Sequence, residues 1–263
     1  MSGAAHIGGD KRDVITDDGL ETLDLLHRRY ATYSAYPGRP LRFLKNAIGD
    51  KARAELADAG VPEPKSKPSK KKARPTVPLP SKPLDASDIN ACFSRETGFP
   101  LFMLDDAIPL DLVATRARFA ANVIGQSEAV DLVADLMATV KARLSRPRKP
   151  IASLMFIGPT GVGKTEMAKA LAEFLFGDRD RLTRFDMSEF GNEAAVQRLI
   201  GGGFQTEGLM TAKVREHPFS VILLDEFEKA DPSFYDLLLQ VLGEGRLTDS
   251  AGRVADFSNA LII

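Results

Sequence analysis

The sequence of 263 residues predicts an α/β fold, in which a parallel β-sheet is flanked by helices. The first observation is that short apolar runs alternate with amphipathic stretches after residue 150. Such alternation is typical of parallel sheets, because the connection between parallel strands needs a crossover, usually a helix. The second is a glycine-rich segment, "GPTGVGKT", placed between the first of these strands and the first of these helices. We expect strands at "IASLMFIG", "RLTRFDM", "FSVILLDE" and "NALII", and helices at "TEMAKALAEFLFG" and "PSFYDLLLQVLGEG".

Composition and charge exclude several protein classes. Hydrophobic residues make up 44% of the chain, and the net charge is -1, so nothing global indicates a nucleic-acid or anionic-membrane partner. The single cysteine, Cys92, excludes an internal disulfide and fits a reducing compartment. No apolar stretch approaches the roughly 20 residues of a membrane helix, and the N-terminus lacks the apolar region of a signal peptide. We therefore expect a soluble cytoplasmic protein.

The first 60 residues predict a small helical subdomain. Apolar and aromatic residues recur at helical spacing from Leu20 to Tyr30, and again from Leu41 to Ile48. The segment "YPGRP" separates the two runs, because proline fixes φ and removes a hydrogen-bond donor.

Residues 61–84 predict a linker rich in proline and lysine. The sequence of this segment, "VPEPKSKPSKKKARPTVPLPSKPL", has almost no large apolar residue and is typical of a solvated, partly polyproline segment. The basic cluster leaves two interpretations open, a contact to nucleic acid or an acidic partner, and a charge run that keeps a tether extended.

Residues 85–263 predict the globular part. Its first helix has an apolar face of Ile89, Cys92 and Phe93 and a glycine stop at Gly98. On that face Cys92 is a packing residue rather than a nucleophile. A second helix begins at Ser127 and continues with valines and a methionine at helical spacing.

The segment from Gly158 to Thr165 fits the G-x-x-x-x-G-K-[ST] phosphate-loop pattern. Glycines let the backbone curl so that successive N–H groups point inward and bind phosphate oxygens. The lysine reaches the β and γ phosphates, and the threonine hydroxyl binds magnesium. A strand before the loop and a helix after it support this interpretation over a chance glycine-rich turn. The predicted nucleotide-binding residues are Gly158, Pro159, Thr160, Gly161, Val162, Gly163, Lys164 and Thr165.

A phosphate loop requires an acidic partner on a second strand, and "VILLDE" supplies it. Asp225, at the end of a fully apolar run, is expected to hold the Mg²⁺ shell, often through water. Glu226 beside it is expected to orient and deprotonate the attacking water, as a general base. Two solvated carboxylates at a strand end are the alternative.

With these motifs placed, residues 85–263 resemble the second ATPase module of the Clp-type AAA+ unfoldases. The likeness rests on "VIGQSEAV", "GPTGVGKTEMAKALAEFLFG", "RFDMSEF", "VQRLIG", "HPFSVILLDEFEKADPSFYDLLLQVLGEGRLTDSAGR" and "DFSNALII". The resemblance implies a P-loop NTPase fold with ATP and Mg²⁺ as cofactors. It implies that Val123 and Ile124 line the adenine pocket, that Thr165 and Asp225 hold the metal, and that Glu226 and Lys164 are catalytic. Residues 1–60 look like the helical lid of a preceding module, in which Arg39 is similar to an arginine called sensor 2.

The resemblance also implies a function. It is ATP-driven protein unfolding or disaggregation in a homo-hexamer, with protein substrates, a possible protease or adaptor partner, and no nucleic acid or membrane. In this family an aromatic residue of a pore loop grips the substrate, and Phe204 is the aromatic available in "RLIGGGFQTEGLMT". Phe204 either pulls substrate or packs under a shortened loop. If it does not pull, the alternative is an assembly factor or scaffold that binds ATP without threading substrate.

The last residues, "FSNALII", read as a buried strand. In the family pattern this strand lies centrally, between the phosphate-loop strand and the "VILLDE" strand, and continues to a polar sensor residue. We therefore expect a module that is incomplete at the C-terminus, before this sensor, and a chain that alone binds nucleotide weakly and hydrolyses little.

Overall fold

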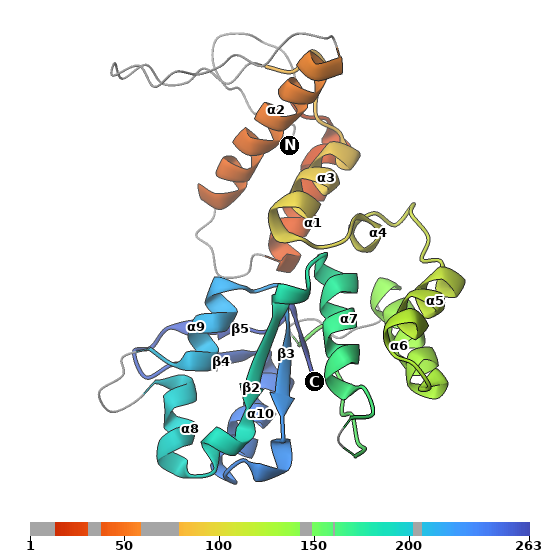
Figure 1. The fold of residues 1–263 in the computed structure, drawn as a ribbon. Coiled ribbons are helices and arrows are strands. Elements are labelled where there is room, and N and C mark those ends of the chain that lie inside the picture. The colour runs from red at the N-terminus through yellow and green to blue at the C-terminus, as the bar shows by residue number, and fades with distance from the viewer. Residues whose placement is uncertain (1–13, 31–37, 59–78, 143–148, 160, 202–206) are drawn as a thin grey trace. The chain divides into compact units, whose positions relative to one another are not determined.

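The computed structural model describes residues 14–30, 38–58, 79–142, 149–159, 161–201 and 207–263. Contacts divide the chain into two compact units, residues 1–96 and residues 97–263 (Figure 1). Among the described residues, no helix combines the length and the apolar composition needed to cross a membrane.

The first unit consists of helices packed around aromatic side chains. The helices are α1 (Asp17–Tyr30), α2 (Gly38–Asp58) and α3 (Ala86–Thr97). Phe43 of α2 and Phe93 of α3 have ring centroids 6.0 Å apart, and the buried ring of His27 lies edge-on to Phe43 at 5.2 Å. Cys92 is buried beside them, and burial raises the pKa of its thiol to about 11. The thiol is therefore protonated at neutral pH and packs as a small apolar group.

Helix α3 belongs to this first unit. The division between the two compact units falls between Glu96 and Thr97. Polar contacts hold α3 against α2: Asn46 donates to Glu96 over 2.7 Å, and Lys51 pairs with Asp88. The apolar face of α3 is covered here because α1 and α2 supply the aromatic partners.

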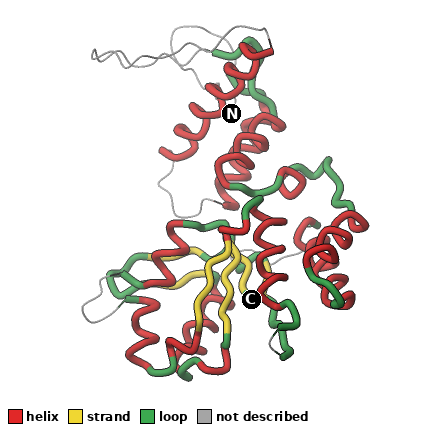
Figure 2. Tube along the Cα trace, viewed as in Figure 1, coloured by secondary structure: helices red, strands yellow, loops and turns green. Residues whose placement is uncertain are grey.

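The second unit is a parallel sheet with helices on both faces (Figure 2). Within the described residues the sheet order is β1-β6-β3-β2, and every pairing is parallel. This confirms the predicted parallel sheet and the central position of the last strand. The elements are α4 (Leu101–Leu104), α5 (Leu112–Asn122), α6 (Ser127–Lys141), β1 (Ala152–Ser153), α7 (Lys164–Phe176), η1 (Arg179–Arg181), β2 (Leu182–Asp186), η2 (Met187–Phe190), α8 (Glu193–Ile200), α9 (Leu209–Glu216), β3 (Ser220–Asp225), η3 (Phe227–Lys229), α10 (Ser233–Glu244), β4 (Arg246–Thr248), β5 (Val254–Asp256) and β6 (Ala260–Ile262).

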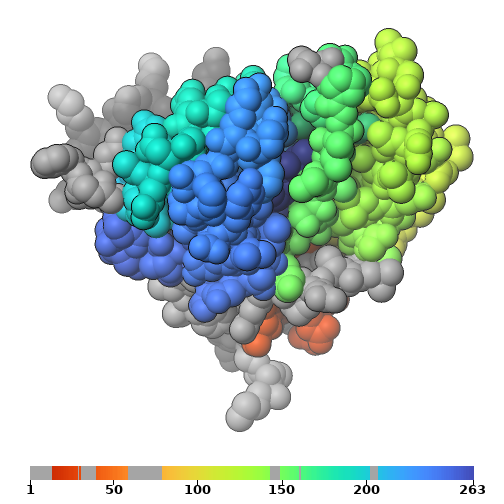
Figure 3. Space-filling model, turned by 90° about the horizontal axis from the view of Figure 1, so that it is seen from below, coloured from red at the N-terminus to blue at the C-terminus, as the bar shows by residue number. Residues whose placement is uncertain are grey.

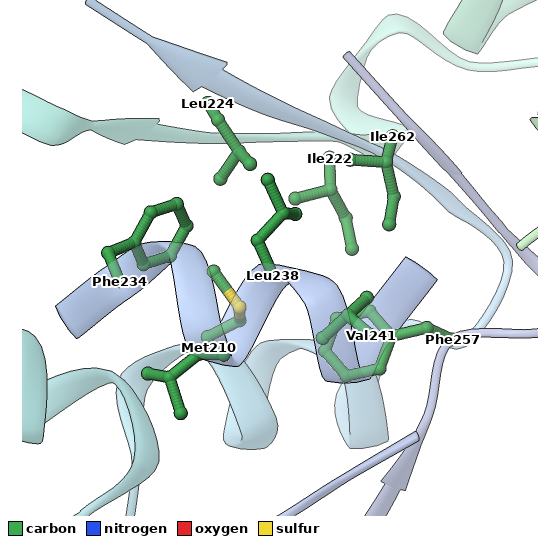
Figure 4. A pocket seen from close by; sticks show the side chains of 9 residues that line it. Met210, Ile222, Leu224, Phe234, Leu238, Val241, Phe257 and Ile262 are labelled. Atoms are coloured by element: carbon green, nitrogen blue, oxygen red, sulfur yellow. The ribbon is translucent and has the colours of Figure 1, made fainter. Parts of the chain in front are cut away.

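Strand β3 is buried on both faces, as expected for a central parallel strand. Successive side chains of a strand point to opposite faces. Ile222 and Leu224 point toward α10 on one face, where Figure 4 shows them opposite Phe234, Leu238 and Val241 around a small apolar gap. On the other face, α7 packs against β3 and β2. The gap is lined by apolar side chains alone and is a packing defect of the core rather than a ligand site.

A second, antiparallel pair of strands, β4 and β5, is not among the strands expected from the sequence. Its turn is organised by Asp249, whose side chain is fully buried. The carboxylate accepts hydrogen bonds from the backbone N–H groups of Ala251 (3.0 Å) and Arg253 (2.8 Å), and from the Arg253 Nε (2.8 Å). Arg215 of α9 approaches the same carboxylate at 3.2 Å. The hairpin is thereby tied to α9.

The Asp249 carboxylate predicts a pH-dependent stability. Burial alone would raise its pKa, but the hydrogen bonds from Arg253 and the charges of Arg253 and Arg215 hold the pKa below its usual value. A lowered pKa stabilises the folded state above about pH 4, and this stabilisation is lost as the pH falls through the folded-state pKa. We expect Asp249→Asn to lower the melting temperature by roughly 5 °C at pH 7, and the difference from wild type to shrink below pH 4. Melting curves at pH 7 and pH 3.5 check this; a difference that does not change with pH would contradict it.

Candidate nucleotide-binding site

The phosphate-loop segment and the acidic pair lie at the same edge of the sheet. The loop follows β1, and Asp225 is the last residue of β3. Because β1, β6 and β3 are parallel, their carboxyl ends meet at one edge, where α/β proteins bind ligands. Figure 3 shows the green segment with α7 beside the blue segment with α10, and dark blue C-terminal residues visible between them. Strands β1 and β3 are not adjacent, since β6 separates them.

Glycines shape the loop itself. Gly161 and Gly163 have φ angles of 86° and 100°, a left-handed region that L-residues with a side chain rarely adopt. A Cβ at Gly163 would also lie 3.3 Å from the Cγ1 atom of Val123. The end of the loop is therefore packed against Val123, which is buried, whereas the next side chain, Ile124, is 88% exposed. Thr160 lies outside the described residues.

Lys164 is the first residue of α7 and folds back over the loop. Its Nζ donates to the carbonyl oxygens of Gly158 (2.6 Å) and Pro159 (3.0 Å). Thr165 follows in the first turn of the helix. The N-cap residue, Gly163, has no side chain to accept bonds from the first N–H groups of α7. These N–H groups and the helix dipole favour an anion at this end.

Each carboxylate of the acidic pair has a cationic partner. The side chain of Asp225 is 22% exposed, and its Oδ2 lies 2.7 Å from the Nη2 atom of Arg184 on the neighbouring strand β2. The Glu226 carboxylate lies 2.6 Å from the Nζ of Lys229, one 3-10 turn later. The bond to Glu226 raises the pKa of Lys229. Asp225 and Glu226, with the residues around them, form an acidic corner of the site, and Arg184 and Lys229 supply its two cations.

Glu226 has an unusual backbone. Among the described residues it is the non-glycine residue with a positive φ, 54°. Such a conformation costs of order 1–3 kcal/mol and persists where the surroundings fix it. Here its N–H donates to the Asp225 Oδ1 over 3.1 Å, and its carbonyl accepts from the Lys229 N–H over 2.9 Å. Backbone contacts on both sides of Glu226 thus fix the turn after β3.

A third acid lies beside the pair. Asp186 ends β2 and is directly opposite Asp225 in the strand register. Hydrogen bonds from the Ser188 hydroxyl (2.5 Å) and from the Ser188 N–H hold its pKa below the usual range. Sequence reasoning missed Asp186, Arg184 and Lys229 as members of this corner. An acid at the carboxyl end of a predicted parallel strand was the available signal for Asp186.

The donors suit magnesium better than a metal held by protein alone. In the part of the chain that the structure describes, no group of three or more His, Cys, Asp or Glu side chains is arranged to hold a metal ion. Mg²⁺ keeps several waters and is commonly held by one or two carboxylates together with substrate phosphates. The partly exposed Asp225 fits that requirement.

Other residues singled out in the sequence fall differently. Phe204 lies outside the described residues, as does the side chain of Arg39. Two arginines of the β4–β5 hairpin, which were not singled out above, are both paired: Arg246 with Glu244 over 3.0 Å, and Arg253 with Asp249 and Glu207. Since Arg253 turns inward to the Asp249 carboxylate, it is part of the hairpin structure.

The chain is similar to a known protein family and to several curated proteins. A family model described as "AAA domain (Cdc48 subfamily)" matches residues 149–263. The chaperone protein ClpB of Bacteroides thetaiotaomicron is 46% identical over 185 residues, which are 68% of this chain and 22% of that protein. A probable chaperone protein ClpB of Chlorobaculum tepidum is 45% identical over 185 residues, which are 68% of this chain and 42% of that protein.

Solved structures extend the likeness over nearly the whole chain. An Hsp104–ADP complex of Saccharomyces cerevisiae superposes with a TM-score of 0.67 at 31% sequence identity. The match covers 95% of this chain and 40% of the Hsp104 chain. A closed state of Hsp104 with ATPγS and FITC casein superposes with a TM-score of 0.71, at the same identity and coverage. The chain thus spans less than half the length of these relatives. The motifs, the sheet order and these similarities show that the chain belongs to the Clp-type AAA+ ATPase family, the group of ClpB and Hsp104.

Proposed function

We propose that this chain binds ATP with Mg²⁺ at the carboxyl edge of its sheet and supplies the residues that hydrolyse it in the protein that carries this chain, while the chain alone hydrolyses little. The observation that carries the proposal is the placement of the Gly158–Thr165 loop and the Asp225–Glu226 pair at one edge, with α7 packed against β3. A chance glycine-rich turn would have no acidic pair opposite it.

The loop residues hold the phosphates in this proposal. Lys164 exchanges the carbonyls of Gly158 and Pro159 for β- and γ-phosphate oxygens, and the N–H groups of the loop and of the first turn of α7 donate to the remaining oxygens. Thr165 and Asp225 hold the metal. Val123 and the exposed Ile124 supply the apolar surface for the adenine, because Val123 already packs on Gly163 at the end of the loop.

Glu226 acts as the general base. It accepts a proton from the attacking water, after its carboxylate has exchanged Lys229 for that water. Mg²⁺ held by Thr165 and Asp225 would supply positive charge to offset the charge that develops on the phosphate oxygens. Arg184 orients the Asp225 carboxylate along the strand edge, through the contact of 2.7 Å between Nη2 and Oδ2.

For the whole protein that carries this chain, we propose ATP-driven unfolding or disaggregation of protein substrates in a cytoplasmic homo-hexamer. ClpB is named a chaperone, and an Hsp104 structure contains casein. We further propose residues 1–60 as lid of a preceding module, residues 61–84 as linker, and residues 85–263 as the ATPase part. Phe204 is the candidate residue for gripping substrate, and Arg39 is the candidate sensor.

The test is an unfolding assay on the protein that carries this chain, with a tagged folded substrate and ATP. We expect ATP-dependent loss of the folded signal, and we expect Phe204→Ala to slow it while ATP hydrolysis continues. Hydrolysis without any unfolding would favour the scaffold function instead. Failure to bind ATP at all would refute both.

A further inference from the structure

Arg179, which no sequence motif singles out, connects two parts of the proposed site. It lies in the short turn η1 between α7 and β2. Its Nη2 donates to the Oε1 of Glu166 (2.6 Å) and to the Oδ1 of Asn122 (3.1 Å), and its Nε donates to the Oε2 of Glu173 (2.9 Å). One guanidinium therefore joins α7 to the end of α5.

The two ends of this bridge adjoin the two halves of the proposed ligand. Glu166 lies in the first turn of α7, two residues after Lys164. Asn122 is the last residue of α5, and the chain continues directly into Val123 and Ile124. The bridge thus spans from the phosphate-binding end of α7 to the segment proposed to contact the base.

The orientation of the Asn122 amide is fixed independently. Its Nδ2 donates to the carbonyl of Arg118 over 2.9 Å, one helical turn earlier. The amide nitrogen is occupied there, so the Oδ1 faces Arg179 as an acceptor. Bonds from Arg179 to Glu173 and Glu166 raise the pKa of the guanidinium, so it carries its charge throughout the working range.

The segment Asn122–Ile124 is therefore held against the phosphate loop at two points. Val123 contacts Gly163 by packing, and Asn122 is held to Glu166 through Arg179. Other contacts between α5 and α7 lie further along α7: Arg118 pairs with Glu173 at 3.7 Å, and Phe119 packs on Phe174 with ring centroids 5.1 Å apart.

We propose that Arg179 is a positioning residue that sets the distance between the base-contacting segment and the phosphate loop, and so contributes to the preference for a nucleotide over a bare triphosphate. The proposal rests on the proposed ATP site. Arg179 touches neither the base nor the phosphates; it acts through Asn122 and Glu166. Losing it should weaken the part of binding that depends on the nucleoside and leave the part that depends on the phosphates.

The experiment measures dissociation constants of the 263-residue chain for Mg-ATP and for Mg-tripolyphosphate by calorimetry. The informative quantity is the ratio of the tripolyphosphate constant to the ATP constant. In Arg179→Gln we expect this ratio to fall about fivefold, the size typical of partly exposed charged contacts. The tripolyphosphate constant itself should change by less than about twofold.

Three further variants separate positioning from general stability. Arg179→Lys keeps a positive charge near Glu166 and Glu173 but lacks the planar fork that reaches three acceptors, so it should lower the ratio like Arg179→Gln. Asn122→Ala should lower it as well, with no further fall when combined with Arg179→Gln. Lys169→Gln removes another cation, 3.7 Å from Glu166, that has no contact with Asn122, and should leave the ratio unchanged.

The outcomes are distinguishable. An unchanged ratio in Arg179→Gln, or equal losses for both ligands, would overturn the positioning role while leaving the ATP site intact. A wild-type ratio of one would also overturn it, because the base would then contribute nothing. If the wild-type chain bound neither ligand, the ATP site itself would be refuted, and the positioning role with it.

Discussion

Replacement of Glu226 by glutamine is expected to slow hydrolysis of bound ATP by about 10²–10⁴-fold, the usual contribution of a general base. Glutamine keeps the shape of the side chain and its reach, but it cannot accept the proton of the attacking water at neutral pH. Binding of ATP should change little, because the phosphates are held by the loop and by α7. Single-turnover hydrolysis in the protein that carries this chain, together with a binding titration, checks both parts.

Glu228 supplies the matched control. It lies two residues further on in η3, is exposed, and carries the same charge. We expect Glu228→Gln to hydrolyse ATP at nearly the wild-type rate. Equal rates for wild type and Glu226→Gln would remove Glu226 from the chemistry, and an equal loss in both variants would point to the net charge of the turn.

Replacement of Lys164 by methionine is expected to weaken Mg-ATP binding by about 100-fold, since charge-assisted hydrogen bonds to phosphate oxygens are among the strongest in proteins. The ammonium now bonded to the Gly158 and Pro159 carbonyls would be lost, and methionine fills a similar volume. Adenosine, which has no phosphate, should bind both proteins equally weakly. Titration with Mg-ATP and with adenosine measures the two effects separately.

The control for this variant is Lys169→Met on the same helix, whose ammonium lies 3.7 Å from Glu166. Its loss should alter ATP affinity by less than about threefold. If Lys164→Met bound Mg-ATP as tightly as wild type, the assignment of the loop to phosphates would be wrong.

The sheet was largely predictable because its strands are apolar runs with regular spacing. The final run was correctly placed between the phosphate-loop strand and the acidic strand, as β6. The hairpin of β4 and β5 was not, since "GRLTDSAGR" is polar and glycine-containing and owes its structure to the buried Asp249. Strand β1 is also shorter than its apolar run: it pairs with β6 alone in the described sheet, and Ile157 is 88% exposed.

The residues of the candidate site also fall into two groups, those that local sequence motifs reveal and those that only the tertiary structure brings together. Local motifs suffice to single out Lys164 and Asp225 as candidates, because phosphate and metal binding require fixed residue types at fixed spacing. Their cationic partners depend on tertiary structure. Arg184 meets Asp225 only through the register of β2 with β3, and Arg179 meets Asn122 across 57 positions of sequence. No local pattern in the chain reveals either contact.

Because Glu226 has a left-handed backbone, a substitution there that raises thermostability is expected to lower turnover. Glycine is the residue best suited to that φ, so a search for heat-resistant variants should be drawn to position 226 and should favour the substitution that deletes the base. Natural selection for activity therefore has to retain a conformationally unfavourable glutamate there, and must find heat resistance at other positions in the chain.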